Sequence, residues 1–207
     1  MNKLRIILLA IVFISGLTSG IVRAATASQV LAKASSKIRS AKGIDCGFTV
    51  SSSGHTLNGM LKCAGSKFQI SAGGNVSWYN GKDLYTYVSS SNETTVVKPT
   101  ASELAEANPL AYLQGYSAQY NASFSKNTPK GKYVVDLIPK TRKAAARKVT
   151  VTLNSATYTP EKLVITALDK SITIVKITKL TFLKSISAST FEYPKSRYAR
   201  ATVVDLR

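Results

Sequence analysis

Apolar and polar residues alternate along most of this chain in short runs, the pattern of β-strands with one buried face. Turn residues separate the runs at the intervals of a meander or barrel. No repeat of about 20 to 50 residues is present and no linker divides the chain, which favours one domain. The alternation predicts strands over 44–51, 57–64, 67–71, 76–79, 84–88, 94–97, 120–125, 132–138, 148–153, 163–168, 172–181 and 202–206.

Two regions show helical spacing instead. Apolar residues recur every three or four positions in 28–39, which predicts a helix with Thr26 or Ser28 as its N-cap. Further along, Thr100 and Glu103 have the spacing of a capping box. Asn108-Pro109 ends that second helix and starts another, with Asn108 as N-cap.

Asn80-Gly81 lies between two aromatic-rich runs and predicts a two-residue type I′ hairpin turn. A sheet that passes into a broken amphipathic helix is typical of a half-barrel with a lid. The expected fold is therefore mainly β with short helices (α+β). It is an incomplete antiparallel β-barrel with an N-terminal helix and a helical lid, an architecture suited to an apolar ligand.

The first 24 residues have the order of a cleavable signal peptide. Basic residues precede the apolar run 6–14, which is too short to span a bilayer, and small residues follow it. Cleavage is expected after Ala24 or Ala27. The predicted organisation is a signal peptide over 1–24 and a single domain over 25–207, exported as a soluble protein.

The chain is strongly basic, with 28 lysine and arginine residues against 10 acidic ones. Three basic residues lie in the predicted signal peptide, so the mature formal charge is about +15. Such a charge favours anionic partners, including transient contact with an anionic membrane surface. Nucleic acid is disfavoured because the protein is exported and no basic cluster lies on a recognition motif. The basic run 140–148 is typical of a solvated loop or helix face.

Cys46 and Cys63 are the two cysteines of the chain. A pair in an oxidising compartment usually forms a disulfide. If the hairpin turns at Gly54-His55, the two residues lie opposite each other on one face, within reach of a disulfide. Metal binding has no ligand spacing to support it.

The residue types of catalysis are sparse. His55 is the only histidine and lies in a predicted turn, where a solvated role is favoured over that of a base. No GxSxG or HExxH motif is present. The sequence therefore predicts a protein that is not an enzyme.

The chain contains the motifs WYNGKDLYTY (78–87), Asn92-Glu93, Lys98-Pro99-Thr100, Glu103-Leu104, NPLAYL (108–113), FEY (191–193) and VVDLR (203–207). Together these motifs resemble the LolA-like outer-membrane lipoprotein carriers, over most of the mature chain. The resemblance implies a half-barrel wrapped on a helix, with a helical lid over an apolar cavity and without a cofactor. It also implies a periplasmic monomer that shuttles acylated lipoproteins, loaded by an inner-membrane lipoprotein-releasing transporter and received by an outer-membrane acceptor.

The chain departs from the family's pattern before the WY hairpin. Well-studied carriers have an arginine in that strand, which helps to latch the lid by hydrogen bonding. The matching segment here has Lys67 and Gln69, and neither makes a bidentate fork. Gating of the lid is therefore an open question at this point.

The candidate ligand-contacting residues are apolar and come from two groups. Leu104, Leu110 and Leu113 are expected to form the apolar stripe of the lid. The inward-facing candidates, each equally expected in an ordinary β-core, are Phe48, Val50, Leu57, Leu61, Phe68, Ile70, Val76, Trp78, Tyr85, Tyr133, Val135, Leu137, Val149 and Val151.

Three functions are compatible with these patterns. The first is a periplasmic lipoprotein carrier. The second is a periplasmic envelope-stress sensor or regulatory lipid-binding domain of the same fold. The third, disfavoured by the residue inventory, is an exported enzyme that acts on glycolipid or wall polymer.

Overall fold

A computed structural model describes residues 25–207 except 142–143 and 145. The predicted signal peptide and part of the basic run 140–148 therefore lie outside the described residues. The elements within them, in chain order, are α1 (Ala27–Arg39), β1 (Ile44–Ser52), β2 (His55–Ala64), β3 (Lys67–Ala72), β4 (Asn75–Tyr79), β5 (Leu84–Val88), β6 (Glu93–Val97), α2 (Ala101–Ala107), α3 (Ala111–Gln119), β7 (Tyr120–Phe124), β8 (Lys132–Pro139), β9 (Lys148–Asn154), β10 (Pro160–Thr166), β11 (Ile172–Phe182), the 3₁₀ turn η1 (Ala188–Phe191) and β12 (Thr202–Asp205).

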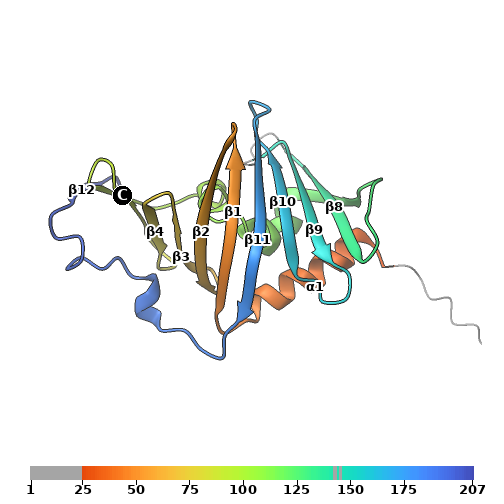
Figure 1. Cartoon of the computed structure of the whole chain (residues 1–207), viewed down its shortest axis with the longest axis horizontal. Coiled ribbons are helices and arrows are strands. Elements are labelled where there is room, and N and C mark those ends of the chain that lie inside the picture. Colours follow the sequence, from red (N-terminus) through yellow and green to blue (C-terminus); the bar gives the residue numbers. More distant parts are fainter. Residues whose placement is uncertain (1–24, 142–143, 145) are drawn as a thin grey trace, which may run out of the picture.

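The strands form one large sheet that does not close into a barrel (Figure 1). Its order is β12-β6-β5-β4-β3-β2-β1-β11-β10-β9-β8-β7, and every neighbouring pair is antiparallel except β12 and β6. The chain builds one half through β1–β6, crosses over through α2 and α3, and completes the other half through β7–β11. The predicted half-barrel with an N-terminal helix is confirmed.

Residues of one sheet face pack against α1 and α3, and we call this the inner face. It includes Cys46, Leu61, Phe68, Val135 and Val151, all buried in one hydrophobic core. The helix α1 adds an apolar stripe to this core, and the predicted cap at its start is present. Thr26 caps the helix through a capping box with Gln29. The α1 residues in the core are Ala27, Val30, Leu31, Ala34 and Ile38.

The opposite, outer face of β4–β6 is covered by the segment that follows β11. Trp78 makes edge contacts with Tyr193 and Tyr198, at 5.5 Å and 5.4 Å between ring centroids. Tyr85 stacks on Tyr193. The segment then ends in β12, which pairs with β6. The C-terminal segment thus gives β4–β6 a second buried face.

The hairpin at Asn80-Gly81 exists, but its turn is wider than predicted. Tyr79 pairs with Leu84, which leaves a four-residue loop. The Asn80 side chain accepts hydrogen bonds from the backbone of Lys82 and Asp83. The loop is therefore organised by the asparagine side chain, and Gly81 is the residue with a positive φ there.

The predicted disulfide is wrong, since Cys46 and Cys63 are both buried free thiols. Ser53 and Gly54 have positive φ and form the β1–β2 turn, one position before the expected one. Cys46 therefore pairs with Leu61 rather than with Cys63, which puts the cysteines on a diagonal. Burial raises the pKa of Cys46 to about 12 and that of Cys63 to about 11. Both thiols stay protonated, which disfavours their oxidation.

Candidate functional site

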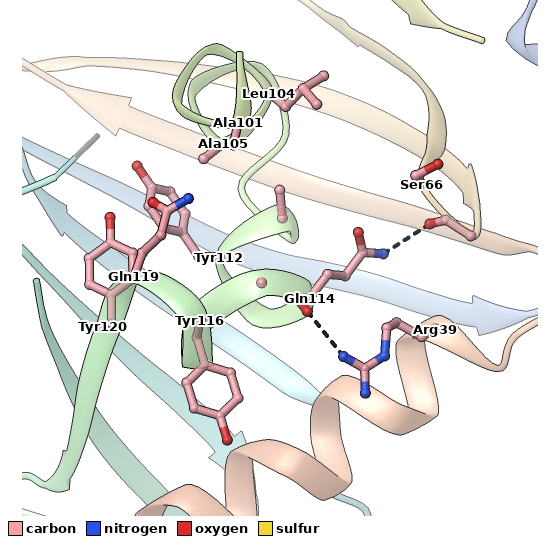
Figure 2. Close-up of a pocket in the computed structure, with 13 residues that line it drawn as sticks. Arg39, Ser66, Ala101, Leu104, Ala105, Tyr112, Gln114, Tyr116, Gln119 and Tyr120 are labelled. Carbon is pink, nitrogen blue, oxygen red and sulfur yellow. Dashed lines mark hydrogen bonds between the residues drawn. The ribbon is translucent and has the colours of Figure 1, made fainter. Parts of the chain in front are cut away.

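The candidate site is a cavity of about 470 Å³ beside the helices that follow β6. Its walls come from α2, α3, the C-terminal end of α1 and the β2–β3 turn (Figure 2). The volume falls in the range of roughly 300–1,000 Å³ that is typical of small-molecule sites. The lining surface is mostly apolar, and the lining residues are Arg39, Gly65, Ser66, Ala101, Leu104, Ala105, Ala111, Tyr112, Gln114, Gly115, Tyr116, Gln119 and Tyr120.

Local sequence signals position the two helices of this cavity. Thr100 and Glu103 form the predicted capping box at the start of α2. Hydrogen bonding to Thr100 lowers the pKa of Glu103, so the carboxylate stays ionised at the helix start. Asn108 separates the helices, and its side chain accepts a hydrogen bond of 3.0 Å from the backbone N–H of Leu110. The break lies where Asn108-Pro109 predicts it, although the N-cap of α3 is Leu110 rather than Asn108.

The three predicted lid leucines occupy two different environments. Leu110 is 1% exposed and Leu113 is fully buried, and both belong to the core beneath the helices. Leu104 is only partly buried and lines the cavity. In this closed arrangement, α3 fills the interior of the half-barrel with its own leucines, while α2 presents Leu104 to the open space beside it.

A polar latch holds α3 against the rest of the protein. Arg39 donates a hydrogen bond of 3.1 Å to the backbone oxygen of Gln114. The Gln114 side chain donates another, also 3.1 Å, to the backbone oxygen of Gly65 in the β2–β3 turn (Figure 2). The Tyr116 hydroxyl donates a third, 2.8 Å long, to the backbone oxygen of Ser28 in α1. The lid is therefore tied to both α1 and the sheet.

Lys67 and Gln69, considered above as substitutes for the absent arginine, have no part in this latch. Phe68 and Ile70 contribute to the core on the inner face, so Lys67 and Gln69 project from the outer face. Their side chains lie on the side of the sheet away from α3. Arg39 supplies the cation from another element, the end of α1.

Tyr116 and Tyr120 in the cavity wall are uncharged phenols. Burial raises the pKa of Tyr116 and that of Tyr120. Tyr112 and Tyr120 meet edge to face, with ring centroids 6.1 Å apart. These rings give the cavity a neutral, mainly apolar wall, and Arg39 is the one cation among its lining residues in the described part of the chain.

The structure packs many of the inward-facing candidates into the inner-face core, and none of them is among the described lining residues of the cavity. Leu57 has 47% of its surface exposed and lies outside the buried core. Val76, Trp78 and Tyr85 lie on the outer face instead, where Trp78 and Tyr85 pack under the C-terminal segment. These three do not reach the inner face. The candidates that the inner-face core does contain are Phe48, Leu61, Phe68, Val135, Leu137, Val149 and Val151, with Val50, Ile70 and Tyr133 packed against it.

Several cavity residues were not among the sequence candidates. Arg39 is missed because a basic residue in the last turn of a helix is explained by the helix dipole alone. Gln114, Tyr116 and Gln119 are missed because the candidates were restricted to apolar side chains, whereas these three residues of α3 carry polar groups. Tyr112 and Tyr116 are four residues apart, the spacing of one helix face, and this is the signal that could have found the aromatic wall.

Comparison with known proteins agrees with this architecture. Residues 17–168 match the family described as outer membrane lipoprotein carrier protein LolA. The chain belongs to this family. No curated protein matches the chain significantly.

Solved structures resemble this LolA-family chain at low sequence identity. An uncharacterized conserved protein from Thermus thermophilus has a TM-score of 0.59 and 12% identity, over 86% of this chain and 98% of that one. A LolA superfamily protein from Nitrosomonas europaea has a TM-score of 0.45 and 14% identity, over 82% and 99%. The MucA/MucB complex of Pseudomonas aeruginosa contains a chain with a TM-score of 0.44 and 12% identity, over 86% and 63%. The first of these likenesses supports the fold.

Membrane-spanning helices and clustered metal ligands are both absent from the described part of this LolA-family chain. None of its helices there is long and apolar enough to cross a membrane. Within the same residues, no group of three or more histidine, cysteine and acidic side chains is placed to hold a metal ion. His55 begins β2 and is exposed.

Proposed function

We propose that this protein is a periplasmic carrier that binds the acyl chains of lipoproteins and moves them toward the outer membrane. The observation that carries the proposal is the apolar cavity between the two lid helices, directly beside a core that α3 fills with its own leucines. Family membership supports the same role. The site is built for binding, and the proposal includes no catalytic step.

The closed lid gives this role a physical mechanism. Burial of one long acyl chain is favourable by roughly 10 kcal/mol, at about 0.8 kcal/mol per methylene group. An acyl chain that enters from the cavity replaces Leu110 and Leu113 in the interior, and the displaced leucines lose their own burial. This exchange offsets part of the gain. Cargo is therefore held less tightly than in a preformed empty cavity, which permits release.

The proposed partners are those that would supply the acyl chains and those that would accept them. An inner-membrane lipoprotein-releasing transporter would load the acyl chains, and an outer-membrane acceptor would receive them. The protein would act as a monomer, since the lid, the latch and the cavity all lie within one chain.

A reconstituted capture assay tests the proposal. The mature protein is incubated with inner-membrane vesicles that contain a triacylated lipoprotein, and the soluble fraction is assayed for that lipoprotein. We expect a soluble complex with one lipoprotein per chain. A protein that leaves all of the lipoprotein in the vesicles, with a releasing transporter and ATP present, would favour the regulatory alternative.

The latch leads to a second prediction, on lid dynamics. Arg39→Ala removes a charge-assisted hydrogen bond to the backbone oxygen of Gln114, an interaction worth about 1.5–3 kcal/mol. We expect amide hydrogen exchange in α2 and α3 to become at least about tenfold faster, while exchange in β8 stays unchanged. Mass spectrometry of exchanged peptides measures both segments in one experiment.

Lys37→Ala is the matched control for this prediction. Lys37 also lies in the last turn of α1, but it donates to the backbone oxygen of Thr157, away from the lid. Unchanged exchange in α3 after Arg39→Ala, or an equal increase after Lys37→Ala, would contradict the latch.

A further inference from the structure

The outer face of the central strands is rich in lysine. Lys62, Lys162, Lys176 and Lys179 alternate with inner-face core residues on β2, β10 and β11, so they project from the outer face. Among the described residues, none of the four takes part in an ion pair. We call these four residues the lysine face.

Strand register places like charges opposite each other in this surface. Lys162 of β10 is the direct cross-strand partner of Lys176 of β11. Like charges in this arrangement destabilise a sheet. The Glu161 carboxylate on β10 does little to offset this repulsion, because it forms an ion pair with Lys132. The protein therefore keeps an unfavourable charge pair on an otherwise ordinary antiparallel sheet.

Exposed aliphatic side chains lie at the end of the same two strands. Leu168, in the β10–β11 turn, is 62% exposed, and Ile172, at the start of β11, is 52% exposed. Lys170 stands between them with a positive φ of 72° at the tip of the turn. The hairpin thus ends in two apolar groups beside a cation, and both strands carry a lysine of the opposed pair.

We propose that the lysine face and the β10–β11 tip dock this protein on a membrane of anionic phospholipids. The lysines would lie over lipid phosphates, and Leu168 and Ile172 would enter the interface between headgroups and acyl chains. A combination of cations and apolar groups is what interfacial binding requires. A purely electrostatic partner such as an acidic protein would have no use for the exposed aliphatic tip.

The position of this surface is compatible with carrying cargo. The helices lie behind the central strands in Figure 1, so the lysine face and the lid are on opposite sides of the sheet. Docking through the outer face leaves α2, α3 and the cavity accessible. The inference goes beyond the proposed function, because a regulatory protein with this surface would dock in the same way.

Vesicle co-sedimentation of the mature protein, without any lipoprotein, tests the inference. The probes are vesicles of phosphatidylglycerol and phosphatidylethanolamine, compared with vesicles of phosphatidylcholine alone. Each lysine near an anionic surface accounts for about a fivefold change in affinity, so Lys162→Gln with Lys176→Gln should weaken binding to the anionic vesicles about 30-fold. Leu168→Ser should weaken the same binding about tenfold. Vesicles of phosphatidylcholine alone should bind little of the original protein or of any variant.

The matched control removes two charges elsewhere. Lys126 and Lys130 are both exposed in the β7–β8 loop, at the end of the sheet opposite the β10–β11 tip. Lys126→Gln with Lys130→Gln should reduce binding less than about threefold. Thermal unfolding should show that the Lys162→Gln, Lys176→Gln variant is at least as stable as the original, because a repulsion is relieved. The inference would be overturned if the two double lysine variants lost the same affinity for anionic vesicles. It would also be overturned if Leu168→Ser bound these vesicles as tightly as the original protein.

Discussion

Leu110→Glu is expected to lower the free energy of unfolding by several kcal/mol. Leu110 is 1% exposed in the core between α3 and the inner face, where a carboxylate has no partner. Urea unfolding followed by circular dichroism measures the change. Leu110→Met, which conserves volume, should cost less than about 1.5 kcal/mol. A Leu110→Glu variant as stable as the original would show that α3 is not part of the folded core.

The second large effect is expected at Leu104, and it is functional. Leu104 lines the cavity from α2 and is partly exposed, so a charge at this position remains hydrated in the cargo-free protein. When an acyl chain fills the cavity, the same charge loses its water. Leu104→Glu should therefore reduce capture of a triacylated lipoprotein from vesicles at least about tenfold and leave urea unfolding nearly unchanged.

Leu104→Met controls for the loss of the leucine itself. Methionine keeps the volume and the apolar character, so capture should stay within about twofold of the original. If Leu104→Glu captured the lipoprotein as well as the original protein does, the cavity would not be where the acyl chains bind. The contrast between Leu104 and Leu110 matters because only one of these two leucines faces the cavity.

The strands were predicted well because alternation is a local property of the sequence. All twelve predicted strands exist, and their boundaries differ from the observed ones by a few residues at most. The Thr26 cap of α1, the capping box of α2 and the Asn108-Pro109 break are local as well. These signals fix where elements begin and end, which is enough to anticipate a meander with a helical insertion.

The pairing register of the strands, and the sheet face to which each side chain points, depend on the geometry of particular turns. Local sequence patterns predict that geometry less well. In the β1–β2 hairpin, Ser53 adopts a positive φ that is uncommon for serine, so the turn moved by one residue and the pairing by two. Cross-strand partners became diagonal neighbours, and the predicted disulfide was lost. A shift of the turn by one residue was enough to separate the two cysteines.

The misplaced aromatic residues have a different cause. The β3–β4 turn pairs Phe68 with Tyr79, so Trp78 projects to the face opposite Phe68. Trp78 was one of the inward-facing candidates predicted from the sequence. It is indeed buried, but under Tyr193 and Tyr198, which lie about a hundred residues or more further along the chain. No local pattern reveals that second layer.

The latch was beyond sequence reasoning for the same reason. Arg39 and Gln114 are 75 positions apart, and each is ordinary in its own helix. Their contact exists because α1 and α3 meet on the inner face, a consequence of the whole sheet topology. The sequence left the gating of the lid open, and the structure shows a cation bound to α3 that comes from α1 rather than from the strand before the WY hairpin.

Native mass spectrometry of the protein purified from its own periplasm tests the central claim most directly. If the protein carries lipoproteins, part of the population should have the mass of one chain plus one acylated lipoprotein. Gentle activation should release a species that bears the lipid modification. A population that contains only cargo-free chain, or complexes with partners that lack acyl chains, would contradict the proposed carrier function.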